Sequence, residues 1–182
     1  MGIGHAPILG LRESIWPSTL WPAIAGRAGS VRHLRRRRPE GRKDLTEIRP
    51  PEGFVEMGRS GPFAADNGPF YVRGRAGGGF DYGFVAEPRH ENPNGIVHGG
   101  MLIAFADHFL GHAVVSATGQ TCATVNLTTD YLASARTPSW IQGEAEIVSR
   151  SRSMVFLRAL VSCGDTRLLS VSSVYRIFEP RG

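Results

Sequence analysis

The sequence contains little lysine, little cysteine and no long apolar run. Only one of its 21 basic residues is a lysine, so nearly every positive charge is an arginine. The two cysteines, Cys122 and Cys163, lack the spacing of a metal site, and we interpret them as free thiols in a reducing cytoplasm. No stretch of about eighteen apolar residues occurs, which argues against a membrane-spanning helix. These absences predict a cytoplasmic protein without a structural metal or a membrane anchor.

The positive charge is concentrated at the N-terminus. Residues 1–43 contain nine Arg or Lys and two Glu, a net charge of +7, while 44–182 contain twelve Arg and fourteen Asp or Glu, a net charge of −2. We expect residues 1–50 to be a basic tail, which is disordered, a targeting segment or the result of a misassigned start codon. Nucleic-acid binding is not expected, because no helix-turn-helix or zinc pattern accompanies the arginines.

Residues 51–182 have the pattern of one α+β domain. Two strands joined by a glycine-rich turn are predicted over 70–73 and 80–86, followed by a helix from Gly99 to about Ser116 that Gly119 ends. The alternating or β-branched runs after the helix predict four more strands, over 122–131, 140–148, 154–162 and 168–178. The short turns between them favour antiparallel pairing. The expected fold is therefore one long helix against an antiparallel sheet.

The predicted helix is apolar on nearly every side, which is typical of a buried helix. Its one carboxylate, Asp107, is flanked by Phe105, Ala106, Phe109 and Leu110, and the sequence indicates no partner for it. Burying an ionised carboxylate costs several kcal/mol or raises its pKa. A carboxylate at this position therefore indicates a functional role. Asp107 could activate a water molecule or attack a substrate directly, and its removal should not destabilise the fold.

The segment before this helix is rich in turn-forming residues and ends in His98-Gly99-Gly100. Glycines at a helix start leave backbone N–H groups free to point at a ligand, where the helix dipole favours negative charge. Such a donor would stabilise the oxyanion that forms in acyl transfer. A carboxylate and an oxyanion site together are the two parts that this chemistry needs.

Two motifs resemble the PaaI-type acyl-CoA thioesterases of the hotdog-fold superfamily. The first is Asn92-x-x-Gly95-x-x-His98-Gly99-Gly100 followed by Asp107, and the second is the segment TVNLTTDYLASA at 124–135. The similarity extends over roughly residues 60–178. It implies a hotdog fold, in which a curved antiparallel sheet wraps a long central helix. It also implies an acyl-CoA substrate, no cofactor, and a homo-oligomer that is a dimer or a pair of dimers.

The same resemblance implies roles for five residues. Asp107 would be the catalytic base or nucleophile, the Gly99 N–H the oxyanion donor, and Asn92 a residue that orients substrate or water. His98 would shape the loop and contact the substrate, and Thr124 would hold the attacking water. Simpler interpretations remain open: Asn92 and Gly99 are also ordinary turn residues, and Thr124 is an ordinary strand residue.

Coenzyme A contacts are predicted at the turn Arg150-Ser151-Arg152. The guanidinium group suits phosphate recognition by its charge and its forked donors, and the resemblance places coenzyme A contacts around this turn. A solvated turn is the alternative. His108 and His112 share a helix face and could bind a metal, but no third ligand is apparent, so no metal is expected.

The acyl group is left open between aromatic and medium- or long-chain acids. Met101, Phe105 and Phe109 could line its pocket, or could pack under the sheet. Two other functions are considered besides hydrolysis. Glu91-Asn92-Pro93 is similar to a motif of hotdog enoyl-CoA hydratases, but Glu91 and Gly95 replace the Asp and His of that family. The other is a non-catalytic acyl-CoA sensor, against which the retained Asp107 argues.

Overall fold

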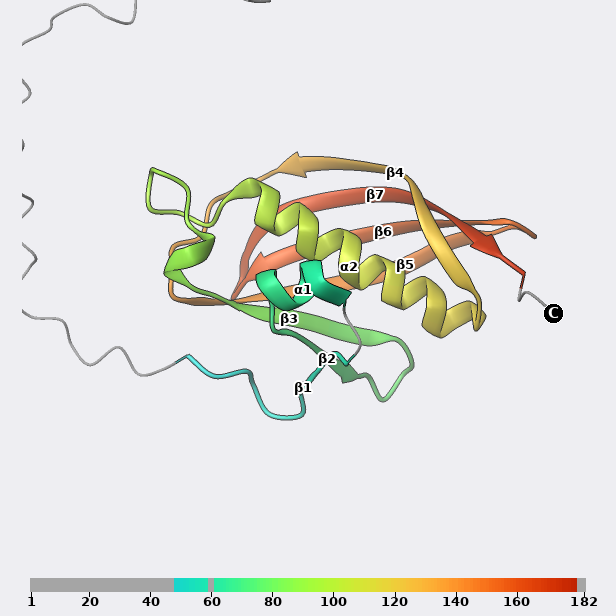
Figure 1. Ribbon diagram of the computed structural model, residues 1–182, viewed down its shortest axis with the longest axis horizontal. Helices are drawn as coiled ribbons and strands as arrows, with labels where there is room; N and C mark the ends of the chain where they lie inside the picture. The colour runs from blue at the N-terminus through green and yellow to red at the C-terminus, as the bar shows by residue number, and fades with distance from the viewer. Residues whose placement is uncertain (1–47, 59–60, 180–182) are drawn as a thin grey trace, which may run out of the picture. The chain divides into compact units, whose positions relative to one another are not determined.

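The computed structural model describes residues 48–58 and 61–179 (Figure 1). Almost all of the predicted tail at 1–50 lies outside the described residues. The elements are β1 (Val55–Glu56), α1 (Gly61–Asn67), β2 (Phe70–Gly74), β3 (Phe80–Ala86), the 3₁₀ helix η1 (Pro88–His90), α2 (Gly99–Thr118), β4 (Thr121–Tyr131), β5 (Ser139–Arg150), β6 (Met154–Cys163) and β7 (Thr166–Phe178).

The strands form one antiparallel sheet in the order β1-β2-β3-β5-β6-β7-β4. The helix α2 runs along one face of this sheet, with β4 on one side of it and β2 and β3 on the other (Figure 1). It contacts β4, β5, β6 and β7. This is the hotdog arrangement, and the α+β fold predicted from the sequence is confirmed.

Both ends of α2 are fixed by residues that the sequence pattern singles out. At the start, the His98 Nδ1 atom accepts a hydrogen bond from the Gly100 N–H at 2.9 Å. At the end, Gly119 adopts a left-handed conformation with φ of 69°, and its N–H donates to the Val115 carbonyl. The helix therefore has the predicted start and the predicted stop.

The core between helix and sheet is largely aromatic. Phe105 and Phe109 are fully buried on α2, and Phe109 stacks on Tyr82 of β3 with ring centroids 4.9 Å apart. Phe105 contacts Phe84 and Phe70 at centroid distances of 4.9 and 5.5 Å. These contacts pack α2 against β2 and β3 and so fix its orientation on that side of the sheet.

The helix is not buried on every side in this chain, so that expectation is wrong. Val115 is 44% exposed, and Ile103, Ala104 and Asp107 are only half-buried. By length and hydropathy, α2 is also apolar enough to span a membrane, but helices at the core of a soluble fold pass the same test. Its packing on the sheet accounts for the buried apolar residues. The residues just named form an outer stripe of α2 that the described part of the chain does not fully cover.

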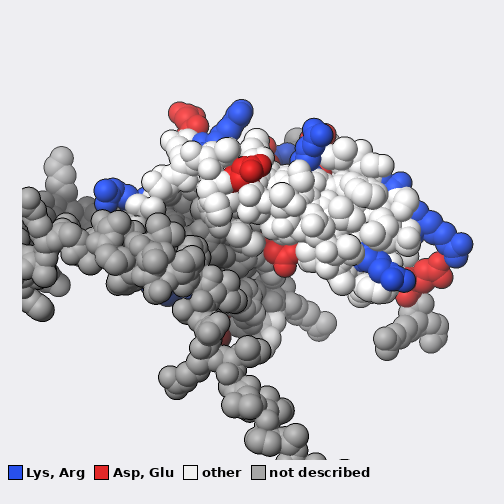
Figure 2. All heavy atoms as spheres, turned by 90° about the horizontal axis from the view of Figure 1, so that it is seen from above, with Lys and Arg blue, Asp and Glu red and all other residues white. Residues whose placement is uncertain are grey.

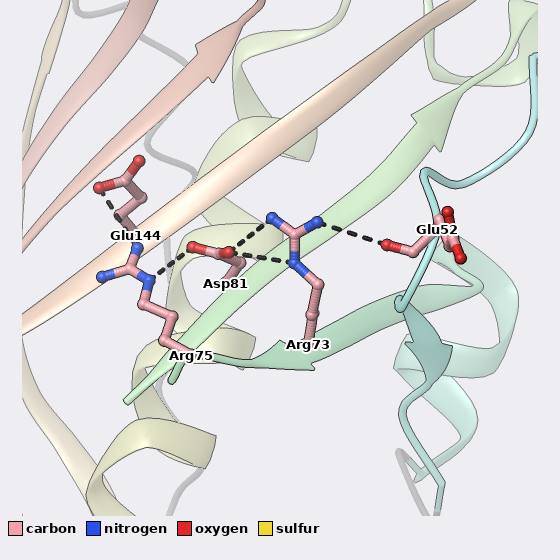
Figure 3. A network of polar contacts seen from close by, with 5 residues as sticks. All are labelled: Glu52, Arg73, Arg75, Asp81 and Glu144. Atoms are coloured by element: carbon pink, nitrogen blue, oxygen red, sulfur yellow. Dashed lines mark hydrogen bonds and ion pairs between the residues drawn. The ribbon is translucent and has the colours of Figure 1, made fainter. Parts of the chain in front are cut away.

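An ion-pair network ties β2, β3 and β5 together on the face of the sheet opposite α2 (Figure 3). The Asp81 carboxylate accepts hydrogen bonds from Arg73 at 2.8 Å and from Arg75 at 2.6 Å, and Arg75 also pairs with Glu144 at 3.3 Å. Burial alone would raise the pKa of Asp81, but the two guanidinium groups outweigh it and hold that pKa below its ordinary value.

We expect Asp81→Asn to lower the free energy of unfolding by about 2 kcal/mol at neutral pH, because the variant loses the charge that two arginines surround. A carboxylate whose pKa is lowered in the folded state stabilises the fold above its unfolded pKa. That contribution disappears as the pH falls through the lower, folded value. Urea denaturation should therefore separate the two proteins at pH 7 and bring them together in strong acid. Glu144→Gln, a change at an exposed pair, should have little effect at either pH.

Candidate active site

Asp107 lies at the middle of α2, half-buried and facing β4 and β7. Its Oδ1 atom accepts hydrogen bonds from the Thr124 hydroxyl of β4 and the Tyr175 hydroxyl of β7, both at 2.7 Å. The Oδ2 atom has no hydrogen-bond partner among the residues that the structure describes. One oxygen is therefore held in place while the other remains available to a water molecule or a substrate.

Tyr175 is a site residue that the sequence pattern does not reveal. It is 2% exposed, and its hydroxyl oxygen also lies 2.9 Å from the main-chain carbonyl of Asp107. Burial and the neighbouring Asp107 carboxylate raise the pKa of Tyr175 above its ordinary value, so the phenol keeps its proton at neutral pH. Because Thr124 and Tyr175 are direct partners in the β4–β7 ladder, the two donors reach the carboxylate side by side.

The expectation that Asp107 has no partner is wrong. Two side chains donate to it, and replacing it by alanine would leave the buried Tyr175 hydroxyl with only the main-chain carbonyl. For this reason we now expect Asp107→Ala to lower the stability of the fold, whereas the sequence alone predicts no such cost. The amide in Asp107→Asn keeps an acceptor oxygen for both donors and removes only the charge, so it is the more informative substitution.

The start of α2 presents one free donor. The Gly100 N–H is taken by His98 Nδ1, and the N–H groups of Met101 and Leu102 point to the His98 carbonyl. The Gly99 N–H has no acceptor within the described part of the chain. Gly99 is therefore the residue whose N–H is open to a ligand at the positive end of the helix dipole, as an oxyanion donor must be.

Asn92 and His98 have local structural roles in this chain. The Asn92 Oδ1 atom accepts a hydrogen bond from the Asn94 N–H at 2.9 Å, and the Asn92 carbonyl accepts one from Gly95. His98 caps the helix through Nδ1 and is otherwise exposed. Both residues shape the loop that leads to Gly99. Their predicted substrate contacts remain predictions.

The predicted coenzyme A turn lies at the other end of α2. Arg150 donates to Gln120, which follows the helix, at 3.3 Å, and Arg152 makes an exposed ion pair with Glu179 at 3.5 Å. Ser151 closes the turn through hydrogen bonds with Met154. Asp107 is separated from the last residue of α2 by about 17 Å along the helix axis. The turn and the carboxylate are therefore not in contact.

The two histidines considered as metal ligands pack against β2 and β3. The His112 Nδ1 atom lies 3.1 Å from the Tyr82 hydroxyl, and His108 packs on the Phe70 ring. Burial lowers the pKa of both histidines. Within the described residues, no cluster of three or more His, Cys, Asp or Glu side chains could hold a metal.

Of the three residues considered for the acyl pocket, Phe105 and Phe109 are core residues under the sheet. Met101 borders a cleft of about 350 Å³ beside the start of α2, which His98, Gly100, Ala104 and Phe63 of α1 also line. The cleft lies next to the helix start that carries the free Gly99 N–H.

We expect Tyr175→Phe to lower the turnover number about tenfold while the fold is kept, because Asp107 then has one donor instead of two. The matched control is Tyr82→Phe, which removes a second buried phenol hydroxyl that contacts His112 and not Asp107. Turnover and thermal unfolding measured on both variants separate the effect on the site from the effect on the core. An equal loss of turnover in the two variants would contradict this role.

A half-buried carboxylate with a free oxygen, and a free N–H at the start of the same helix, are the two kinds of group that acyl transfer needs. Residues 94–170 match the model of the thioesterase superfamily. The chain is 30% identical over 129 residues to PA0474 of Pseudomonas aeruginosa, a protein named as an esterase, and the match covers 70% of this chain and 96% of that one. The chain therefore belongs to the thioesterase superfamily, and the prediction of a thioester hydrolase is confirmed at this level.

Solved structures share the fold. A thioesterase protein of Streptococcus pneumoniae with coenzyme A superposes with a TM-score of 0.56 at 17% identity, over 62% of this chain and 88% of that one. The BH2602 protein of Bacillus halodurans with coenzyme A gives 0.55 at 20% identity, over 60% and 74%. A mutant of the phenylacetic acid degradation protein PaaI of Thermus thermophilus gives 0.58 at 19% identity, over 65% and 100%.

Proposed function

We propose that this protein hydrolyses the thioester of an acyl-CoA, with Asp107 and the Gly99 N–H as its catalytic groups. The observation that carries the proposal is the geometry of Asp107, whose Oδ1 atom is fixed by Thr124 and Tyr175 while Oδ2 is open. Support for the coenzyme A part comes from the two neighbours of the same fold that were crystallised with coenzyme A. The acyl group is an aromatic or a medium- to long-chain acid.

The reaction follows from these two groups. As a base, Asp107 takes a proton from water, and the hydroxide forms a C–O bond with the thioester carbonyl. The carbonyl oxygen becomes an oxyanion next to the Gly99 N–H, and collapse of the intermediate breaks the C–S bond. The thiolate of coenzyme A leaves and takes up a proton, and the free acid remains. As a nucleophile, Asp107 would instead form an anhydride that water then opens.

We further propose that each site is shared by two chains. Gly99 and Asp107 are eight residues apart in α2, which is about 12 Å along the axis. A base and an oxyanion donor for one carbonyl both lie within roughly 3 Å of the reacting atoms, so one chain cannot supply both. Two antiparallel α2 helices across a two-fold axis bring Gly99 of one chain to Asp107 of the other, twice.

The free edge of β4 is the surface on which such a dimer would form. β4 is the last strand in the sheet order, is eleven residues long and contains one charged residue, Asp130. Native proteins protect exposed edges with charges, proline or short strands, and β4 has little of these. Figure 2, which views the molecule from the side on which β4 lies in Figure 1, shows few and scattered charges there. Val125 on β4 is 56% exposed. Edge-to-edge pairing would also cover the outer stripe of α2. Two such dimers could form a tetramer.

Release of free coenzyme A from a panel of aryl and alkyl acyl-CoAs tests the function. We expect steady thiol release with at least one class of acyl chain. An acyl-CoA sensor would bind the same compounds and release no thiol. An enoyl-CoA hydratase would add water to a trans-enoyl-CoA and leave the thioester intact, which absorbance of the enoyl group detects. Binding or hydration without thiol release would contradict the proposal.

A further inference from the structure

Tyr131, the last residue of β4, lies directly against Gly99 at the start of α2. If Gly99 carried a Cβ atom, that atom would lie 2.8 Å from the Tyr131 hydroxyl oxygen and 2.9 Å from two carbons of its ring. Real Cβ atoms essentially never have contacts this short. The phenol therefore occupies the space that a side chain at the first residue of the helix would need, and Gly99 permits this close approach.

The main chain fixes this contact. Tyr131 pairs with Leu169 in the β4–β7 ladder, and the next residue, Leu132, donates its N–H to the Leu168 carbonyl at 2.9 Å. On the other side, the Val97 N–H donates to the Ala135 carbonyl at 2.9 Å. The loop that enters α2 is thus hydrogen-bonded to the segment that leaves β4. The position of the phenol beside Gly99 follows from the fold, although its ring is half-exposed.

The two donors are close enough to share one oxygen. A backbone nitrogen lies about 2.5 Å from the Cβ position of its own residue, so the Tyr131 hydroxyl lies within about 5.3 Å of the Gly99 nitrogen. Donors in an oxyanion hole lie about 3 Å from the oxygen that they stabilise, so two of them can be up to about 6 Å apart. The Tyr131 hydroxyl has no hydrogen-bond partner among the described residues, so its proton is available.

We propose that Tyr131 is a catalytic residue. Its hydroxyl donates a hydrogen bond to the thioester oxyanion, as a second donor in addition to the Gly99 N–H. This inference rests on the proposed function. As water or Asp107 adds to the carbonyl carbon, the negative charge forms on the oxygen between the two donors. When the C–S bond breaks and the thiolate leaves, the carbonyl returns and the hydrogen bonds weaken. Both donors come from one chain, and the carboxylate comes from its partner.

The test is the turnover of Tyr131→Phe, which keeps the ring against Gly99 and removes only the hydroxyl. We expect kcat to fall between about tenfold and a hundredfold, while KM changes little. The loss is smaller than for an oxyanion donor in a site closed to water, because the Tyr131 ring is half-exposed. Tyr71→Phe on β2 removes a tyrosine hydroxyl away from this site and is the matched control. Thermal unfolding of both variants should match that of the wild type, because neither packing nor charge changes.

Asp107→Asn, assayed in parallel, separates the two proposals. Loss of turnover in both Asp107→Asn and Tyr131→Phe supports the inference. If Tyr131→Phe stays within twofold of the wild type while Asp107→Asn is inactive, the role of Tyr131 is overturned and the proposed function remains. An effect of Tyr131→Phe on KM alone also overturns it, because the hydroxyl would then contact the ground state only. Full activity in Asp107→Asn overturns both proposals.

Discussion

Asp107→Asn is expected to lower acyl-CoA hydrolysis by about 10²- to 10⁴-fold, the range found when a general base is removed. The amide cannot take a proton from water, nor can it attack a thioester. Its oxygen can still accept the hydrogen bonds that Thr124 and Tyr175 donate to Asp107. The substitution therefore removes the chemistry and leaves the contacts that surround it.

The stability of the variant decides how this loss is interpreted. We expect the free energy of unfolding of Asp107→Asn to stay within about 1 kcal/mol of the wild type, since both hydroxyl donors keep an acceptor. Asp66→Asn, on the exposed surface of α1, is the matched control and should be fully active. Turnover near the wild-type value in a folded Asp107→Asn protein would show that the carboxylate does not carry the reaction.

Much of the fold could be predicted because its signals are local. The apolar pattern of α2, the glycines at its start and the terminating Gly119 define the central helix within the sequence itself. The later strands alternate or are β-branched, and the structure places them within a few residues of the predicted bounds. The predicted elements do not include the two-residue strand β1, the short helix α1 or η1. These elements are short, and their form depends on the residues against which they pack.

The candidate site could be predicted only in part. The sequence identifies Asp107 and Gly99 because each departs from its surroundings, a carboxylate among apolar residues and a glycine at a helix start. Tyr175 and Tyr131 have no such signal, because a tyrosine in a strand is an ordinary residue. Their importance comes from the pairing of β4 with β7 and from the position of α2 on the sheet. These are contacts between residues far apart in the chain, which no local pattern specifies.

The second large effect is expected in a dimer of two different variants, one without the Asp107 carboxylate and one without the Gly99 N–H. The choice of substitution at Gly99 is important for this test. Gly99→Pro removes the free N–H, and proline is well tolerated at the first position of a helix. His98, with φ of −63° and ψ of 132°, already has the extended conformation that a following proline requires. The new ring carbon would displace Tyr131. Gly99→Ala places a Cβ at the same position and keeps the N–H, so the difference between the two variants reports the N–H alone.

Co-expression of Asp107→Asn with Gly99→Pro is the most direct test of a site shared by two chains. Each variant alone should be nearly inactive. Random pairing makes half of the dimers mixed, and each mixed dimer has one site with both groups intact and one with neither. Differently tagged chains allow the mixed dimers to be isolated and counted. We expect about a quarter of the wild-type activity to return in the mixture, and half in the purified mixed dimer. A mixed dimer as inactive as its two parents would contradict the shared site.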